Sequence, residues 1–171
     1  MKKSSTHVVS LTGQEPSLQV PGGSMTHVDA SVFPILERLS IRRLLLAPRG
    51  VREPHWHPAT AEMGYVLQGR ARMTVLSPGA SVDTYELGPG DVYFIPRAYP
   101  HHIEDIGQGD IHFLVFFDRE TPGDIGCKAA VSAYSREVLA ATFGCDVATL
   151  PPFPFTAQDP LIVPRGNPVD R

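Results

Sequence analysis

The chain has 171 residues, of which 42% are hydrophobic and 19% charged, and its formal net charge is −3. These values fit one globular domain of ordinary composition, and no basic block indicates a nucleic-acid partner. The longest apolar runs, such as 113–117, are far shorter than the roughly 20 residues that cross a membrane. We therefore expect neither nucleic-acid nor membrane binding. The 17 prolines and 15 glycines predict many turns, which favours short strands over long helices.

The first residues differ from a secretory signal, because no apolar segment follows Lys2 and Lys3. A cytoplasmic location is therefore our default expectation. The two cysteines, Cys127 and Cys145, are too few for a disulfide framework. We interpret them as reduced thiols, with a single disulfide as the alternative.

Residues 1–24 are polar and rich in turn residues, and we expect an extended arm that lies against a partner subunit. From about 25 to 117, short strand-like runs alternate with Gly and Pro turns. The run that contains Ala71, Met73 and Val75 shows a clear alternation of apolar and polar residues. Repeated short strands of this kind predict an all-β sandwich or barrel.

After residue 117 the chain changes character. A polar loop is expected at about 118–128, and a helix between Ser135 as N-cap and Gly144 as terminator. A second short helix is expected at 146–150. From Pro151 onwards, repeated prolines exclude a regular helix or a central strand. We expect an extended tail draped over the barrel or over a neighbouring subunit.

These segments predict one domain over residues 1–171. Its barrel core lies at about 25–117, and a C-terminal helix and Pro-rich tail follow at about 132–171. No internal repeat divides the chain.

The candidate chemistry begins with His55-Trp56-His57. Alternate residues of a strand share a face, so both imidazoles point the same way. Glu62 follows after a turn and can return to the same spot, and His101 lies on a later strand. Three imidazoles and one carboxylate suit Mn, Fe, Ni, Co or Zn, and leave open positions for a substrate or dioxygen. The alternatives are a structural histidine pair, or an iron site without His101.

These residues resemble the motifs of the cupin family. Segment 50–69 resembles the first motif, with one residue fewer than usual before its histidines. Segment 90–101 resembles the second, with Ala98 where Gly is usual, and Asp105 stands where Asn is frequent. The resemblance implies a cupin jelly-roll β-barrel with a short C-terminal helical segment and extended N- and C-terminal arms. It also implies the metal ligands, which are His55, His57, Glu62 and His101.

Within the cupins, segments 52–57, 69–75, 90–96 and 136–144 resemble the oxalate decarboxylases. That resemblance covers roughly residues 20 to 155 and implies manganese as the metal, with dioxygen as co-substrate or co-catalyst. Such proteins often carry two barrels, so this chain resembles the single-domain members. Cupins commonly form oligomers, which implies a homodimer or a larger homo-oligomer.

The resemblance also implies that Arg52 anchors the substrate carboxylate, which agrees with the bidentate pairing of guanidinium and carboxylate groups. Strand parity alone does not place Arg52 beside His55, so we expect Pro54 to interrupt the strand. A solvated surface arginine is the alternative.

In the oxalate decarboxylases a glutamate on a mobile lid moves protons. The lid here is the loop at about 118–128, where the usual Ser-Glu-Asn-Ser-Thr sequence is absent. An ungapped comparison places Asp124 at the glutamate position, and Glu120 is a second candidate. An ordinary turn residue is the alternative for Asp124. Aspartate is shorter than the lid glutamate by one methylene group, and a misplaced proton-transfer group slows catalysis. Oxalate oxidase activity is therefore an alternative to decarboxylation.

We therefore expect a manganese-dependent enzyme that acts on oxalate or a similar small carboxylic acid. An oxalate oxidase, or another metal cupin such as a dioxygenase, isomerase or cyclase, is the second hypothesis. A non-catalytic module that binds a metal or a small acid is the third. Two further histidines are interpreted as structural: His102 faces away from His101, and His112 is expected in the core.

Overall fold

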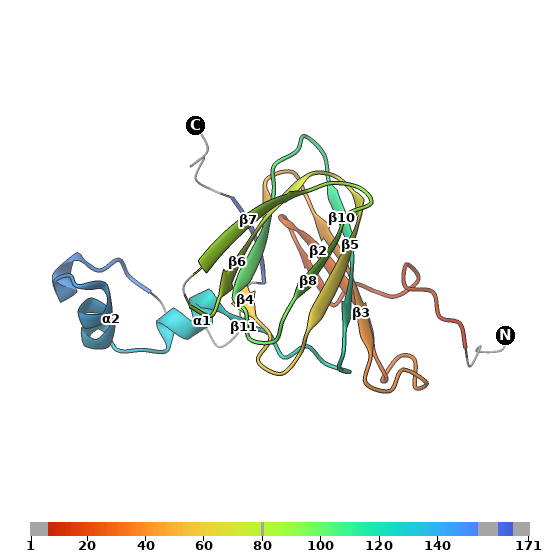
Figure 1. Cartoon of the computed structure of the whole chain (residues 1–171), viewed down its shortest axis with the longest axis horizontal. Coiled ribbons are helices and arrows are strands. Elements are labelled where there is room, and N and C mark those ends of the chain that lie inside the picture. Colours follow the sequence, from red (N-terminus) through yellow and green to blue (C-terminus); the bar gives the residue numbers. More distant parts are fainter. Residues whose placement is uncertain (1–6, 80, 154–160, 166–171) are drawn as a thin grey trace.

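The protein is a two-layer β-sandwich with helices at one side (Figure 1). The computed structural model describes residues 7–79, 81–153 and 161–165. Every strand pair among them is antiparallel. The predicted all-β jelly roll is confirmed.

The first sheet has the strand order β1-β2-β3-β10-β5-β8. Its strands are β1 (Leu18–Val20), β2 (Gly23–Val28), β3 (Ser40–Leu46), β10 (Ile111–Phe117), β5 (Glu62–Gln68) and β8 (Val92–Ile95). The second sheet has the order β11-β4-β9-β6-β7, and β12 pairs with β4. Its strands are β11 (Ile125–Gly126), β4 (Gly50–Trp56), β9 (His101–Asp105), β6 (Ala71–Ser77), β7 (Ser81–Leu87) and β12 (Ile162–Pro164).

The core lies between the two sheets and follows the alternation of each strand. The predicted inward residues of β6 are buried, while its intervening residues are more exposed. Strand β10 is apolar almost throughout, yet it also alternates, with Phe113, Val115 and Phe117 buried. The prediction for His112 is wrong: it lies half-buried on the outer face, 3.4 Å from Arg43 Nη2 through its Nε2. Strand periodicity, rather than the apolar neighbours, decides its side.

Three elements depart from the expected segments. Strand β1 lies within the predicted N-terminal arm and pairs with β2. Strand β7 is exposed at every residue except Leu87, yet it pairs along the whole of β6. The expected loop at 118–128 ends early, since β11 and then helix α1 (Cys127–Ser132) occupy its last residues. The N-cap of helix α1 is Gly126, which makes no side-chain capping hydrogen bond, so the sequence carries no start signal.

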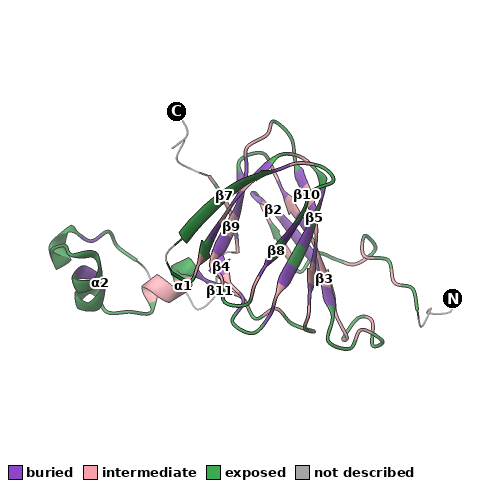
Figure 2. Cartoon of the chain, in the orientation of Figure 1, coloured by how far each residue is buried: buried purple, intermediate pink, exposed green. Residues whose placement is uncertain are grey.

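Helix α2 (Arg136–Phe143) matches the predicted helix at both ends. Ser135 Oγ accepts a hydrogen bond from the Val138 N–H at 3.3 Å, and Gly144 adopts the left-handed conformation with φ 63°. The short 3-10 helix η1 (Val147–Thr149) packs against α2, so the two form a helical arm beside the sandwich (Figure 2). Much of its surface is exposed.

Both cysteines are exposed: Cys127 begins helix α1, and Cys145 lies between α2 and η1. Among the described residues, no helix is long and apolar enough to cross a membrane. Of the predicted Pro-rich tail, residues 154–160 and 166–171 lie outside the described part of the chain. The described residues of the tail include β12, which lies along β4 at the edge of the second sheet.

Candidate metal centre

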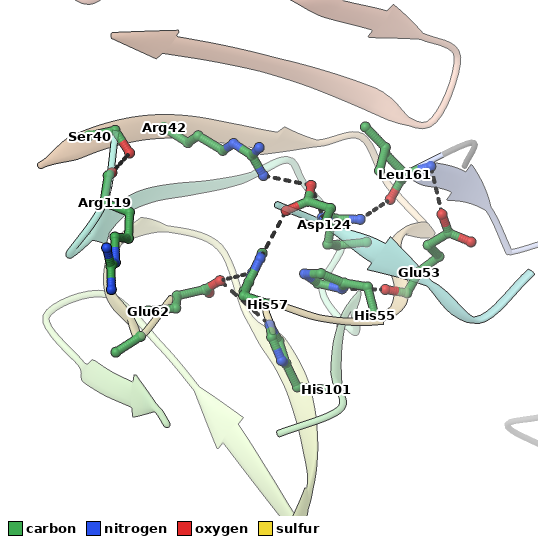
Figure 3. A network of polar contacts seen from close by, with 12 residues as sticks. Ser40, Arg42, Glu53, His55, His57, Glu62, His101, Arg119, Asp124 and Leu161 are labelled. Carbon is green, nitrogen blue, oxygen red and sulfur yellow. Dashed lines mark hydrogen bonds and ion pairs between the residues drawn. The ribbon is translucent and has the colours of Figure 1, made fainter. Parts of the chain in front are cut away.

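Four side chains from three strands, two in the second sheet and one in the first, meet inside the barrel (Figure 3). The β4–β9 pairing sets His55 directly opposite His101, while Glu62 is the first residue of β5. His57 follows the end of β4 and keeps the inward direction of His55. All four residues are at most 4% exposed, and one potential ligand atom from each lies within 4.8 Å of the others. The structure therefore brings the four predicted ligands together.

Each histidine is oriented by a contact at Nδ1. His55 Nδ1 donates to the Glu53 carbonyl at 2.7 Å, and His101 Nδ1 donates to the Tyr99 carbonyl at 2.9 Å. His57 Nδ1 lies 2.9 Å from Asp124 Oδ1. A neutral imidazole that carries its proton on Nδ1 presents Nε2 as a lone pair. His55 and His101 therefore present Nε2 to the centre, whereas His57 lies between two carboxylates: burial lowers its pKa, but the carboxylates outweigh burial and raise that pKa. Carbonyls and carboxylates behind the rings are the arrangement found around bound metals.

The carboxylate of Glu62 faces these nitrogens. Its Oε2 lies 2.9 Å from His57 Nε2 and 3.5 Å from His101 Nε2. Burial raises the pKa of Glu62, but the contacts with His101 and His57 outweigh it and hold that pKa well below its usual range. Burial, together with the charge of Arg52, keeps the pKa of His55 well below its usual value. An ionised carboxylate and a neutral imidazole are the forms that bind a metal.

The donor set fits a divalent ion. His101 Nε2 is fully buried and makes no hydrogen bond with any described residue, a state that costs free energy unless something binds there. Three imidazole nitrogens and one carboxylate match the ligand preferences of Mn, Fe, Co, Ni and Zn.

Tyr93 supports this carboxylate and was missed in the sequence analysis. Its hydroxyl donates to Glu62 Oε1 at 2.7 Å. The Tyr93 ring lies across from Gly64, where an added Cβ would come within 2.1 Å of it. A glycine at this position is therefore required for the tyrosine to reach the ligand. The alternation of side chains along β8 places Tyr93 on the inner face, and this pattern could have identified it from the sequence.

Arg52 lies beside the cluster because the pairing of β4 with β9 shifts register between Arg52 and His55. The irregularity occurs where Pro54 was expected to interrupt the strand. Arg52 is buried, and its Nη1 donates to the Leu161 carbonyl at 3.0 Å. Burial lowers the pKa of the guanidinium, although nearby Asp124 opposes this shift.

Asp124 reaches the centre from the segment just before β11. Its Oδ2 accepts hydrogen bonds from Arg42 Nη1 and Arg52 Nη2, both at 2.9 Å, while Oδ1 faces His57. Burial raises the pKa of Asp124, but His57 and the two guanidinium groups outweigh it and keep that pKa far below its usual value. Ile125, the next residue of the chain after Asp124, pairs with Trp56 of β4.

The other proposed lid carboxylate, Glu120, is not brought to the centre. It is half-buried, and it accepts a hydrogen bond from the Arg38 backbone N–H at 2.7 Å. His102 points away from His101, as predicted, with its Nε2 3.8 Å from Glu104. Arg42, however, was not recognised as a site residue. Strand alternation could have identified it, because Arg42 shares the inner face of β3 with Leu44, two residues away.

Two cavities lie near the centre. A small one of about 20 Å³ is lined by Arg42, Arg52, His55, Glu62 and Phe117, among others. A larger pocket of about 520 Å³ opens between β6, β7 and β8 and is lined in part by Tyr85, Tyr93 and Tyr99. The larger pocket includes none of the four ligands, but two of its lining residues contact them: Tyr93 contacts Glu62, and Tyr99 contacts His101.

Comparison with known proteins gives a consistent result. Oxalate decarboxylase OxdC of Bacillus subtilis (strain 168) is 33% identical over 115 residues, which are 67% of this chain and 30% of that protein. Germin-like protein 1-2 of Oryza sativa subsp. japonica is 32% identical over 137 residues, or 76% of this chain and 61% of that protein. The chain thus spans about a third of the length of the oxalate decarboxylases that it matches.

Among solved structures, Bacillus subtilis oxalate decarboxylase at pH 4.6 superposes with a TM-score of 0.79 and 26% identity, over 91% of this chain and 40% of the other. Another structure of that enzyme, from work on its Mn(II) centres, gives the same TM-score and identity over 90% of this chain and 40% of the other. Residues 9–150 match the family described as Cupin. The chain therefore belongs to the cupin family.

Proposed function

We propose that this cupin is a manganese-dependent enzyme that acts on oxalate or a similarly compact carboxylic acid, with chemistry of the oxalate decarboxylase type. The observation that carries the proposal is the shared cavity. The guanidinium of Arg52 lines the same buried space as His55 and Glu62. The similarity to oxalate decarboxylases supports the substrate, and the Mn(II) centres of that enzyme support the metal.

In this proposal His55, His57, Glu62 and His101 hold the metal, which when bound supplies positive charge and one-electron redox capacity. Arg52 pairs with a substrate carboxylate and fixes its orientation. Phe117 and the surrounding apolar side chains keep bulk water out of the cavity. In this proposal Asp124, whose Oδ1 faces His57, is the carboxylate beside the centre that would accept or return a proton.

The test is an assay of purified, manganese-loaded protein on oxalate in air at mildly acidic pH, with formate and peroxide measured separately. Formate identifies a decarboxylase, and peroxide without formate identifies an oxidase. Arg52→Gln should lose most of either activity, whereas Arg70→Gln, at a side chain that is 64% exposed, should keep it. The proposal is contradicted if protein that contains manganese forms neither formate nor peroxide.

A second candidate is a metal cupin that acts on a larger substrate. The 520 Å³ pocket favours it, because that pocket reaches Tyr93, whose hydroxyl contacts Glu62. The absence of Arg52 from the pocket lining distinguishes this candidate from the first. Turnover of a larger substrate that survives Arg52→Gln would favour it, while metal binding without turnover of any acid would favour a binding module.

A further inference from the structure

Two guanidinium groups from opposite sheets converge on one carboxylate oxygen. Arg42 comes from β3 in the first sheet, and Arg52 comes from β4 in the second. Each places a terminal nitrogen 2.9 Å from Asp124 Oδ2 (Figure 3). Arg42 precedes both sequence motifs, so no motif assigns it a role.

The three side chains are largely removed from water. The exposed fractions are 17% for Arg42, 4% for Arg52 and 9% for Asp124. The Arg42 guanidinium also lies over the Phe117 ring, with 5.2 Å from Cζ to the ring centroid. Two like charges that face the same buried oxygen need an anion between them, because an uncompensated buried charge is strongly destabilising. The pair is therefore built to hold a carboxylate.

The space beside this pair is too small for a substrate in the present conformation. The cavity of about 20 Å³ has room for about one water molecule. A carboxylic acid can reach the guanidinium pair only if the Asp124 side chain leaves. Asp124 lies in the segment between β10 and β11, directly before Ile125 of β11.

We propose that Arg42 and Arg52 form one carboxylate-binding site, that Asp124 occupies it as an internal anion, and that a small carboxylate ligand displaces Asp124. Arg42 is then a second anchoring residue for the ligand. The identity of the ligand as a substrate rests on the proposed function. The existence of the anion site does not, since it depends only on the described geometry.

The test is chemical rescue of stability in the metal-loaded full chain. Asp124→Ala removes the internal anion and should lower the melting temperature by roughly 10 °C. Sodium formate, compared with sodium chloride at equal ionic strength, should recover most of that loss. In the double variant Arg42→Gln with Asp124→Ala, formate should recover much less, because one guanidinium group is gone.

Asp105→Ala is the matched control. Asp105 is also a buried carboxylate, but its oxygens accept hydrogen bonds from the backbone N–H groups of Arg49 and Gly107. Formate that binds the metal would stabilise all variants alike, so only the difference between variants reports the guanidinium site. If Asp124→Ala does not fold, the yield of its refolding in formate against chloride gives the same comparison.

The proposal is overturned if formate fails to stabilise Asp124→Ala, or if it stabilises all three variants equally. Rescue by formate without any oxalate turnover would leave the anion site standing and sink the oxalate assignment. Oxalate turnover without rescue by formate would support the oxalate assignment and refute the anion site. As a second readout, Arg42→Gln should weaken oxalate binding to the metal-loaded protein about tenfold, measured by calorimetry.

Discussion

At the scale of single residues, the centre is defined by what lies behind each ligand. Backbone carbonyls hold the Nδ1 atoms of His55 and His101, and a carboxylate faces that of His57. Tyr93 holds the remaining oxygen of Glu62. Ligands fixed in this way lose little further freedom when an ion binds, so the protein scaffold favours binding.

Ala98 gives a prediction about stability. It lies in the turn between β8 and β9 with φ 64°, a left-handed conformation that costs a residue with a Cβ about 1 kcal/mol. Ala98→Gly should therefore raise the free energy of unfolding by about 1 kcal/mol, measured by urea denaturation. Ala140→Gly, within helix α2, should lower it by a similar amount. A loss of stability in Ala98→Gly would refute this explanation.

The four ligands could be predicted because strand periodicity and two local motifs bring them together. Asp124 was predicted only by resemblance, and its contact with His57 was not predicted at all. The role of Arg42 depends on how β3 of one sheet faces β4 of the other, a relation between sheets that no local pattern records. Tyr93 and Gly64 are likewise a pair formed across two strands.

At the scale of elements, β12 closes the side of β4 that carries Arg52. The Leu161 N–H, just before β12, donates to Glu53 Oε1 at 2.8 Å, and the Glu53 N–H donates back to the Leu161 carbonyl at 3.0 Å. That carbonyl also accepts from Arg52. A strand from the end of the chain therefore positions a residue of the site.

Glu53→Ala should loosen this attachment. It leaves the Leu161 N–H without its carboxylate, and we expect a loss of about 1–3 kcal/mol in unfolding free energy. Hydrogen exchange at the Leu161 amide should become faster as well. The control is Glu86→Ala, a surface ion-pair residue that is 59% exposed and should change stability by less than about 1 kcal/mol. Equal effects of the two variants would contradict the role of β12.

The elements that sequence patterns identified are those with strong local signals. Strand β6 alternates plainly, and α2 has both a cap and a terminating glycine. Strands β1 and β11 are short, and β7 is exposed at every residue except Leu87, so pairing with neighbouring strands defines all three. Their bounds could not be read from composition, since hydrogen bonds to a partner strand define them.

At the scale of the whole molecule, the described chain supplies every residue of the candidate centre, while its helical arm stands apart from the barrel (Figure 1). The arm has a small core of Leu139, Ala140 and Leu150. Large apolar residues of α2 stay outside it, including Val138 at 52% and Phe143 at 60% exposed. A helix this short gains most of its stability from packing.

We therefore propose that a second copy of the chain covers the arm. Light scattering should give a mass of at least a dimer, and Phe143→Asp should shift it towards the monomer. Glu86→Ala, on the exposed strand β7, should leave the mass unchanged. A monomer at every concentration would refute the proposal.

The central claim is that one divalent ion binds to His55, His57, Glu62 and His101. The most direct measurement is the manganese content of the purified, dialysed chain, with His101→Ala and its outward-facing neighbour His102→Ala as the matched pair. We expect one ion per chain in the unaltered protein and in His102→Ala. We expect affinity to fall by more than about 100-fold in His101→Ala, because a direct ligand contributes more than its supporting contacts. Full manganese occupancy in His101→Ala would place the ion elsewhere and contradict the assignment.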